Sequence, residues 1–421
     1  MKIAVVGLWH LGTITSLCLS KIGHRVEAFD NKKIIRNFYK KILPISEPGV
    51  NKLFNKYNKK NLIFNSNLND LNNHNIIWIC YDSKINEKDI SEEKKLFNQI
   101  KKILKFIKKK TTILISSQLP LGTIKKLEKY DKLILKKKLA FIYIPENLRL
   151  GKSIKLFLKP ERIVIGLRDK KIYKNKIKIL LNQIKCEKYL VSPETAEISK
   201  HVINSFLACS ISFINEISQI AKIYGVNFND LQNCIKSDRR LGKYSYLNPG
   251  LPFSGGTLAR DLNFLNNLSN KYKTNNVLIR SIYKSNILHS MWVKNILKKN
   301  IKNKNTSILQ IGLGYTANSS TLRRSFPFQI FKFLNKKCKV KIFDEFIRVN
   351  SKEVDRYKKN FIRLSKNNNL KKFDIILIFS SLKDKTNIKH LKLENSLIID
   401  VNSGNKKFFR DKNLNYISYE V

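Results

Sequence analysis

The first thirty residues hold the pattern that most restricts the fold of this chain. An apolar run at residues 2–6 precedes a turn with glycines at positions 7 and 12, and an apolar helical pattern then leads to a second strand-like run that ends at Asp30. A strand, a glycine turn, a helix and a second strand in this order make a βαβ unit, whose two strands lie parallel in one sheet. The chain is therefore predicted to begin with an α/β domain of the dinucleotide-binding type.

The remaining segments indicate how the chain divides into domains. Further strand-like runs alternate with helical stretches, which predicts a doubly wound parallel sheet with helices on both faces. These runs lie at residues 75–80, 111–116, 139–144 and 162–167. Long helical patterns begin at residue 192, and after a polar run near residue 301 the opening pattern returns and ends at Asp344. We predict a Rossmann-like NAD-binding domain at 1–191, a central helical region for dimerisation and catalysis at 192–300, and a second Rossmann-like α/β domain at 301–421.

The glycine turn predicts how a cofactor is held. The first glycine permits the tight backbone bend, and the last lets the helix pack against the strand, while Trp9 occupies the middle position where a third glycine is usual. Asp30 can accept hydrogen bonds from ribose hydroxyls and repel a 2′-phosphate, which favours NAD over NADP. The turn residues predicted to contact the cofactor are Gly7, Trp9, His10, Leu11 and Gly12. Trp9 packed away from the cofactor is an alternative, and we expect His10 to be a loop residue without a catalytic role.

Composition restricts the partners and the compartment. The net charge of +51 comes from Lys that is spread over the whole chain together with Asn and Ile, which indicates a general compositional bias more than a nucleic-acid-binding surface. The six Cys residues form no CxxC pair, which is typical of a reduced, cytoplasmic protein with mostly buried thiols. No apolar run is long enough to cross a bilayer, so we expect a soluble protein.

The helix that begins after residue 192 carries two candidate features. Glu197, Lys200 and Asn204 are spaced i, i+3 and i+7, so a helix presents them on one face. Lys can act there as a base or electrostatic stabiliser, and Asn can hold a substrate oxygen. The helix also has an apolar face that needs a partner, and we expect this partner to be a second subunit. This face consists of Ile198, Val202, Phe206, Phe213, Ile217 and Ile220.

Several longer motifs follow one another in a fixed order. They are "LPISEPGV" at 43–50, "PENLRLGKSI" at 145–154, "AEISKHVINSFLA" at 196–208, "SDRRLG" at 237–242, "PFSGGTLARD" at 252–261 and "GLGYTANSSTLRRS" at 312–325. With these motifs the chain resembles the UDP-glucose/GDP-mannose dehydrogenase family over nearly its whole length. That resemblance implies oxidation of a nucleotide-sugar hydroxymethyl group to a carboxylate with two NAD, a homodimer formed through the central helices, and a C-terminal domain that helps to hold the nucleotide sugar.

The resemblance also assigns roles to individual residues. The catalytic set is Glu146, Lys200, Asn204, Thr257 and Asp261. Cofactor contacts add Ser117, Gln118 and Arg323 to the glycine turn and Asp30. Substrate contacts are Asn147, Leu148, Arg149, Arg240, Phe253, Gly255, Gly256 and Arg260. No metal ligand is expected.

One departure from the family pattern bears directly on the chemistry. Thr257 stands where the family has the Cys that attacks the aldehyde intermediate, and a threonine hydroxyl without an adjacent base is a poor nucleophile at neutral pH. Gln118, Leu150 and Thr316 replace a Thr, a Glu and a Lys of the family, and "DVNS" at 400–403 lacks its Arg. We interpret "GLWHLG" and "GGTLARD" as two motifs that occur together in a divergent branch of the family, which makes Thr257 a trait of that branch.

Three functions remain open on the sequence. The leading hypothesis is an NAD-dependent oxidation of a UDP-sugar, in polysaccharide or cell-surface glycan precursor synthesis, that stops after one two-electron step. A second keeps both oxidations, with water or another thiol as nucleophile; Cys209 and Cys234 are the nearest in sequence, and both are expected to pack against apolar faces. The third is a non-catalytic protein that binds NAD or a nucleotide sugar as a regulator or scaffold.

Overall fold

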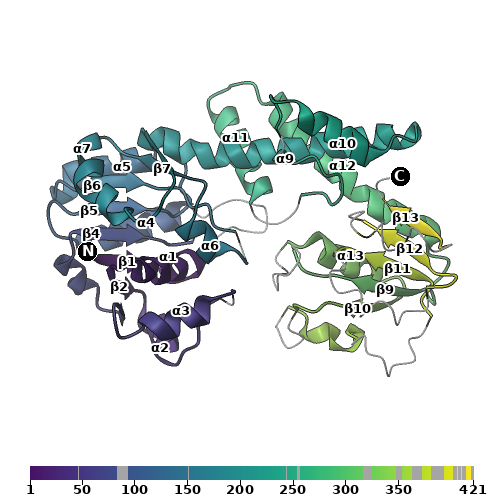
Figure 1. The fold of residues 1–421 in the computed structure, drawn as a ribbon, viewed down its shortest axis with the longest axis horizontal. Helices are drawn as coiled ribbons and strands as arrows, with labels where there is room; N and C mark the ends of the chain where they lie inside the picture. Colours follow the sequence, from purple (N-terminus) through teal and green to yellow (C-terminus); the bar gives the residue numbers. More distant parts are fainter. Residues whose placement is uncertain are drawn as a thin grey trace. The chain divides into compact units, whose positions relative to one another are not determined.

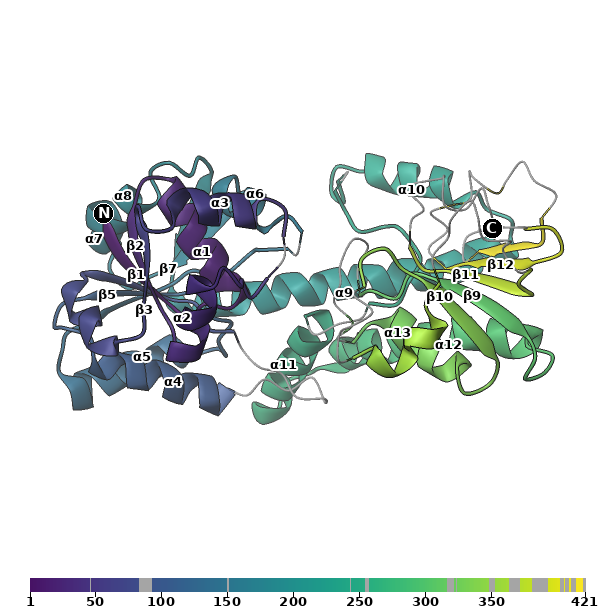
Figure 2. The same ribbon diagram turned by 90° about the horizontal axis from the view of Figure 1, so that it is seen from below.

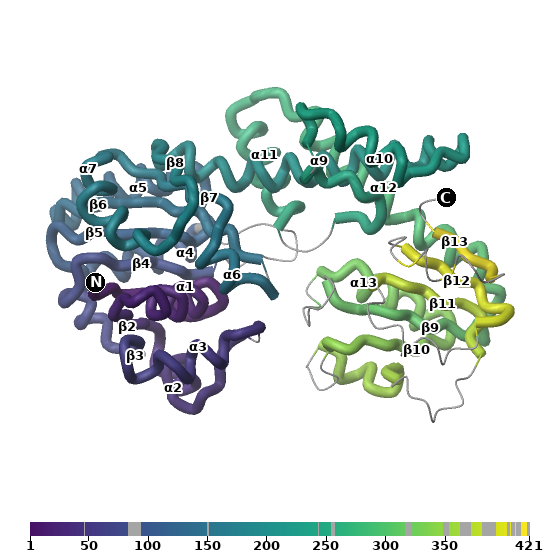
Figure 3. The backbone as a smooth tube through the Cα atoms, viewed as in Figure 1, coloured from purple at the N-terminus to yellow at the C-terminus, as the bar shows by residue number. Residues whose placement is uncertain are grey.

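The computed structural model contains two compact units, residues 1–202 and 203–421. It describes residues 1–45, 47–82, 93–149, 151–242, 244–253, 257–315, 322, 324–347, 353–362, 372–380, 393–401, 405, 409 and 414–418. Figure 3 traces these segments along the backbone. The three-domain division expected above stays a prediction, and each unit is described by itself.

The first unit is built on one eight-stranded sheet in the order β3-β2-β1-β4-β5-β6-β7-β8. Its strands are β1 (Lys2–Val6), β2 (Arg25–Phe29), β3 (Leu62–Asn65), β4 (Ile76–Ile79), β5 (Thr112–Ile115), β6 (Ala140–Tyr143), β7 (Arg162–Gly166) and β8 (Glu187–Val191). The first six are parallel, as expected, but β7 pairs antiparallel with β6. The chain therefore leaves β6 and enters β7 at the same end of the strands, so this connection does not cross a face of the sheet. Sequence reasoning also missed β3 and β8.

Helices cover both faces of this sheet (Figure 1). They are α1 (His10–Lys21), α2 (Lys32–Tyr39), α3 (Val50–Tyr57), α4 (Glu93–Lys105), α5 (Thr123–Tyr130), α6 (Ser153–Leu158), α7 (Lys170–Ile172) and α8 (Lys178–Leu180). Alternate residues of β1 face opposite sides: Ile3 and Val5 pack in a cluster with α1 and α3, and Ala4 and Val6 in a second cluster with α4 and α5. Burial on both faces explains the continuous apolar strands of the sequence. Short helical turns complete the unit: η1 (Leu68–Asn73), η2 (Asp131–Leu135) and η3 (Tyr173–Ile177).

The longest helix, α9 (Pro193–Ile223), begins in the first unit and continues into the second. The second unit adds α10 (Phe228–Ser237), α11 (Leu258–Lys271) and α12 (Val277–Asn300), which can be followed in Figure 2. Buried amides join these helices to the connecting chain, because Asn215 accepts a hydrogen bond from the backbone N–H of Gly250 at 2.9 Å and Asn286 accepts one from Phe253 at 2.8 Å. These contacts hold residues 250–253 against α9 and α12.

The second unit contains a five-stranded parallel sheet in the order β10-β9-β11-β12-β13. Its strands are β9 (Ser307–Ile311), β10 (Lys339–Phe343), β11 (Ile375–Ile378), β12 (Leu397–Asp400) and β13 (Tyr416–Ser418), and its helices are α13 (Phe326–Leu334) and the 3-10 helix η4 (Asp355–Asn360). A lysine of α9, Lys222, donates to the carbonyl oxygen of Ser418 at 3.1 Å. The second Rossmann-like pattern predicted from the sequence is thus a folded sheet.

The two sheets repeat one local design. In the first, the backbone N–H of Gly7 donates to Phe29 and the N–H of Leu8 donates to Asp30 at 2.6 Å. In the second, Gly312 donates to Phe343 and Leu313 donates to Asp344 at 2.7 Å. Each glycine has a positive φ, 94° and 90°. A strand-end carboxylate therefore ties down each glycine turn.

Several side chains differ from the environment expected from the sequence. His10 is the first residue of α1 and not a loop residue. Only two thiols, Cys18 and Cys80, are buried, and Cys234 is exposed, so Cys234 does not pack against an apolar face as expected. Within the described residues, no helix has the length and apolarity that a membrane crossing requires.

Candidate functional site

The glycine turn at the start of α1 has the geometry of an anion site. A Cβ on Gly12 would lie 1.7 Å from the carbonyl oxygen of Gly7, and one on Gly7 would lie 2.7 Å from Tyr81. Trp9 is the N-cap residue but makes no side-chain capping bond, and its side chain is 54% exposed. The first turn of α1 carries no acidic residue. The free N–H groups of the helix are therefore available to a phosphate group.

Asp30 lies at the end of β2, beside this turn. One carboxylate oxygen accepts the N–H of Leu8 at 2.6 Å, and the other accepts the backbone N–H of Asn31 at 2.7 Å. The second of these oxygens also accepts the side-chain amide of Asn31 at 3.0 Å. The oxygen that accepts Leu8 keeps a second lone pair, so the side chain can still accept a hydroxyl. The role of Asp30 as a ribose acceptor stays a prediction that this position supports.

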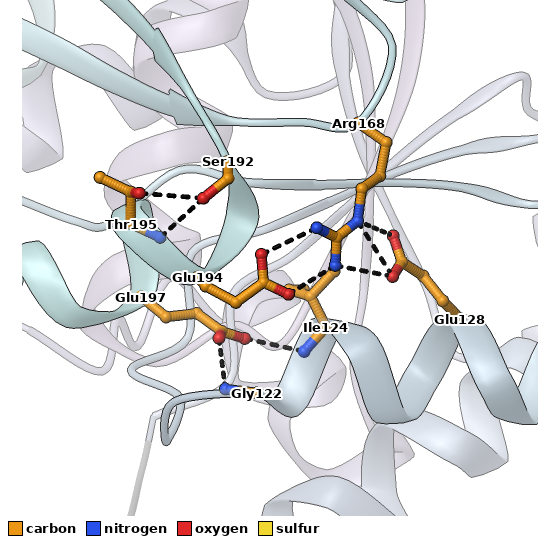
Figure 4. A network of polar contacts seen from close by, with 8 residues as sticks. All are labelled: Gly122, Ile124, Glu128, Arg168, Ser192, Glu194, Thr195 and Glu197. Carbon is orange, nitrogen blue, oxygen red and sulfur yellow. Dashed lines mark hydrogen bonds and ion pairs between the residues drawn. The ribbon is translucent and has the colours of Figure 1, made fainter.

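A carboxylate of α9 holds the loop that contains Ser117 and Gln118. Glu197 is 0% exposed and accepts the N–H groups of Gly122 at 2.6 Å and Ile124 at 2.7 Å (Figure 4). Burial raises the pKa of Glu197 to about 7, against the opposing effect of the two N–H donors. Within the described residues, the buried hydroxyl of Ser117 has no hydrogen-bond partner. Ser117 is therefore free to bind a ligand, whereas Glu197 is committed to the loop.

A second contact in Figure 4 fixes the start of α9 to the sheet. The guanidinium of Arg168 donates to Glu194 at 2.6 and 2.8 Å and to Glu128 of α5 at 3.0 to 3.2 Å. Paired guanidinium–carboxylate contacts of this kind fix the relative orientation of the two groups and also stabilise the contact. The first turns of α9, which carry Glu197 and Lys200, are thus held by α5 and by Arg168, which lies two residues beyond β7.

Lys200 turns toward the segment that follows β6. Its ammonium donates to the carbonyl oxygen of Glu146 at 2.8 Å and lies 3.6 Å from the Glu146 carboxylate. That carboxylate also accepts the N–H of Leu148 at 2.8 Å, while Asn147 and Arg149 are exposed beside it. The expected grouping of Glu197 with Lys200 is therefore only partial, because the two side chains hold different loops.

Sequence reasoning missed one polar cluster in the first unit. His10 Nε2 lies 2.6 Å from Glu47 Oε1, and the hydroxyl of Ser153 lies 2.9 Å from the same oxygen and 3.1 Å from His10 Nε2. Glu47 comes from the quoted segment 43–50 and Ser153 from the segment 145–154. Nothing in their spacing could have joined residues 37 and 106 positions apart.

The second unit brings together three predicted residues. Asp261 is 0% exposed, accepts a hydrogen bond from the amide of Asn204 at 2.5 Å and contacts Arg260 Nε at 3.2 Å. Thr257 precedes α11 as its N-cap residue, is exposed, and accepts the backbone N–H of Asp261 through its carbonyl oxygen at 3.1 Å. The buried Asn204–Asp261 pair is a preorganised polar group of the type that handles a substrate hydroxyl.

The thiol nearest this cluster along the chain is partly buried and not activated. Cys209 packs against an apolar group that includes Phe253 and Ala259, and burial raises the pKa of its thiol. Among the other predicted residues, Arg240 is 89% exposed at its side chain and pairs with Asp238. The remaining ones, Gly255, Gly256 and Arg323, lie outside the described residues, as do the substituted positions Leu150, Thr316 and Asn402.

Comparison with known proteins shows the family to which this chain is related. Residues 1–185 match the UDP-glucose/GDP-mannose dehydrogenase family, NAD binding domain, and residues 194–287 match the central domain of the same family. The UDP-glucose 6-dehydrogenase of Rickettsia prowazekii is 32% identical over 390 residues, which make up 90% of this chain and 88% of that protein. The chain belongs to the UDP-glucose/GDP-mannose dehydrogenase family.

Solved structures agree with this membership at the level of the fold. A UDP-glucose dehydrogenase from Pyrobaculum islandicum superposes with a TM-score of 0.85 at 19% identity and covers 100% of this chain and 97% of that one. A UDP-D-ManNAc dehydrogenase from Pyrococcus horikoshii gives 0.81 at 21% identity, with 100% and 99% covered. The predicted α/β class with two Rossmann-like sheets is confirmed.

Family membership also confirms NAD as the cofactor, because the matched N-terminal domain is the family's NAD-binding domain. The residues present fit this cofactor: Gly12 leaves no room for a Cβ, α1 has an uncapped N-terminus, and Ser117 carries a buried hydroxyl without a partner among the described residues. No group of three or more His, Cys, Asp or Glu side chains that could hold a metal is found in the described segments. The roles of the individual site residues stay predictions.

Proposed function

We propose that this protein oxidises the sugar of a UDP-sugar with NAD and stops after one hydride transfer. The observation that carries the proposal is the arrangement at the start of α11, where Asp261 is buried against Asn204 while Thr257, one turn earlier, is exposed. The parts that handle a hydroxyl proton are retained, and the nucleophile that a second oxidation needs is replaced. The relatives named above suggest a UDP-sugar as substrate.

The residues of this chain would contribute binding, orientation and proton transfer. NAD, when bound, supplies the acceptor for the hydride that leaves the alcohol carbon. Asn204, oriented by Asp261, would hold the substrate oxygen through its amide. Asp261, with an ordered water, would take the hydroxyl proton as the carbonyl forms, and the Lys200 ammonium would stabilise the negative charge that develops on the oxygen. Arg240 and Arg260 are the cations proposed to meet the diphosphate.

The second oxidation is the step that the proposal removes. A carbonyl product must first gain a nucleophile before another hydride can leave, and a Thr257 hydroxyl has a pKa far above that of a thiol. Cys209 does not replace it in this proposal, because its partly buried thiol has a raised pKa and stays protonated at neutral pH. The expected product is therefore an aldehyde or, after oxidation at a ring carbon, a ketone.

The deciding experiment counts the NADH formed per nucleotide sugar consumed, with a panel of UDP-, GDP- and dTDP-sugars. One NADH per sugar is expected, together with a carbonyl product that forms an oxime. Two NADH per sugar would refute the two-electron assignment. Thr257→Cys is the matched gain-of-function variant, and Lys200→Ala should abolish turnover while NADH binding remains.

A non-catalytic protein that binds NAD or a nucleotide sugar is the second candidate function. It is favoured by the exposed Trp9 in the glycine turn and by Thr257, two positions where the site departs from an active dehydrogenase. Tight binding of a nucleotide sugar in calorimetry, with no NADH formed across the panel, would support it. Loss of measurable turnover in Lys200→Ala would exclude it.

We also propose that the central helices form a homodimer. Phe206 and Phe213 on α9 are 70% and 57% exposed, and Ile220, one heptad further, is exposed with them. Ile287 and Met291 expose a similar stripe on α12. Apolar stripes of this length are normally covered by another helix surface. Light scattering should give the mass of two chains, and Phe213→Glu should shift it toward one, while an unchanged monomer mass in the wild type would refute the proposal.

A further inference from the structure

The cluster of His10, Glu47 and Ser153 connects three separate segments of the first unit. His10 begins α1, Glu47 precedes α3, and Ser153 begins α6. An imidazole nitrogen and a carboxylate oxygen 2.6 Å apart require a proton between them, so His10 Nε2–H donates to Glu47 Oε1. The other Glu47 oxygen accepts the backbone N–H of Ser153 at 3.2 Å. In these contacts, the hydrogen-bond donors to the Glu47 carboxylate belong to His10 and Ser153.

Burial makes this carboxylate dependent on its partners. The side chain of Glu47 is 4% exposed and Ser153 is fully buried. A carboxylate removed from water needs hydrogen-bond donors or a cation, and the loss of one donor leaves a desolvated charge. His10, whose side chain is 19% exposed, therefore holds Glu47 in place from the solvent side. A hydrophobic residue at position 10 would leave that charge with Ser153 alone.

The cluster joins the cofactor turn to residues 146–149. On one side, His10 follows Trp9 directly and begins the helix to which the turn at Gly7 leads. On the other side, the Ser153 hydroxyl shares its one proton between Glu47 Oε1 and the carbonyl oxygen of Arg149, each 2.9 Å away. Residues 146–149 also contain Glu146, whose carbonyl oxygen accepts Lys200. The same few hydrogen bonds thus restrain both the phosphate-binding turn and the loop predicted to contact the substrate.

We propose that His10 is a positioning residue that couples the two ligands: the dinucleotide orders the turn, the turn fixes His10, and His10 with Glu47 and Ser153 fixes residues 146–149. The inference rests on the proposed function, since it takes the second ligand to be a nucleotide sugar. A loop that is already ordered costs less conformational entropy when the second ligand binds, so the affinities become cooperative. By thermodynamic linkage the nucleotide sugar raises the affinity for the dinucleotide by the same factor.

The test measures NADH binding by calorimetry with and without a saturating nucleotide sugar, chosen as the one that turns over in the substrate panel. NADH with the unoxidised sugar forms a ternary complex that cannot react, so binding is measured free of turnover. The coupling factor is the ratio of the NADH affinity with the sugar to the NADH affinity without it. In the wild type we expect a coupling factor above one, and in His10→Phe we expect a coupling factor lower by at least about threefold. Ser153→Ala, which removes only the hydroxyl between His10 and Arg149, should lower it as well, and the double variant should be no worse than His10→Phe.

The matched control is His24→Phe. His24 is also buried in the first unit and contacts a backbone oxygen, that of Leu180, at 2.8 Å, but it precedes β2 at the opposite end of the strand from Asp30. It should cost stability and leave the coupling factor unchanged. An equal loss of the coupling factor in His10→Phe and His24→Phe would overturn this inference and leave the proposed function standing. So would a wild-type coupling factor in His10→Phe and Ser153→Ala. A wild type that oxidises no nucleotide sugar would remove the proposed function and this inference together.

Discussion

The charge state of Glu197 makes the stability of the first unit depend on pH in a predictable direction. Burial raises the pKa of this carboxyl from its ordinary value of 4.5 to about 7, although it accepts the N–H groups of Gly122 and Ile124. The folded state therefore binds the proton more tightly than the unfolded state does. The stabilisation is complete below pH 4.5 and is lost as the pH rises through about 7. At about 1.4 kcal/mol per tenfold change, the loss is about 3 kcal/mol at most.

The assay is urea unfolding between pH 4.5 and 8, followed by tryptophan fluorescence in a Trp292→Phe background. The two remaining tryptophans, Trp9 and Trp78, lie in the first unit, so the signal reports on that unit. Glu197→Gln stays neutral at every pH and should remove the decline, which makes the variant relatively more stable at pH 8 than at pH 5. A constant difference in free energy of unfolding between wild type and Glu197→Gln across this range would refute the reasoning.

Glu194→Gln is the matched control, three residues earlier on the same helix. Its bonds to Arg168 lower the pKa of Glu194, so its stabilising effect is present above its ordinary pKa and is lost only as the pH falls below that value. Between pH 5 and 8 this control should follow the pH profile of the wild type. A flattened profile in Glu194→Gln would mean that Glu197 is not the group that titrates.

Three further predictions test the site. Asp261→Asn keeps the volume of the buried side chain but removes the charge between Asn204 and Arg260. In single-turnover experiments kcat should fall by at least about a hundredfold. A kcat within threefold of wild type would remove Asp261 from the mechanism. Gly12→Ala places a Cβ 1.7 Å from the Gly7 oxygen and should weaken NADH binding, read by Trp9 fluorescence, by at least about tenfold. Gly23→Ala is the control: its Cβ would meet only Gln183 at 3.8 Å, but the φ of 90° strains an alanine, so this variant should lose stability and keep NADH binding near wild type. Cys209→Ser should leave the NADH yield per sugar unchanged, because the thiol packs in an apolar cluster, and a reduced yield would identify it as a substitute nucleophile.

Local pattern was sufficient for most of the fold. Apolar runs marked six of the eight strands of the first sheet, and the glycine turns at Gly7 and Gly312 marked where each Rossmann-like pattern begins. β3 and β8 were missed because they are short or partly exposed, so their sequences lack a continuous apolar run. The direction of β7 was missed for a different reason, since strand direction depends on where the connecting chain crosses the sheet and not on the residues of the strand.

The sequence by itself determined the class of this protein, because strand, turn and helix periodicity and the motifs of the family are local properties of the chain. It also predicted that Thr257 stands where the family pattern has a thiol. Only the tertiary structure decided which polar residues share a contact. Glu197 caps a loop that is 75 positions away, and His10 contacts a glutamate and a serine that are 37 and 143 positions away. Such pairings arise when distant segments pack, and burial then sets the pKa of Glu197 and the dependence of Glu47 on its donors.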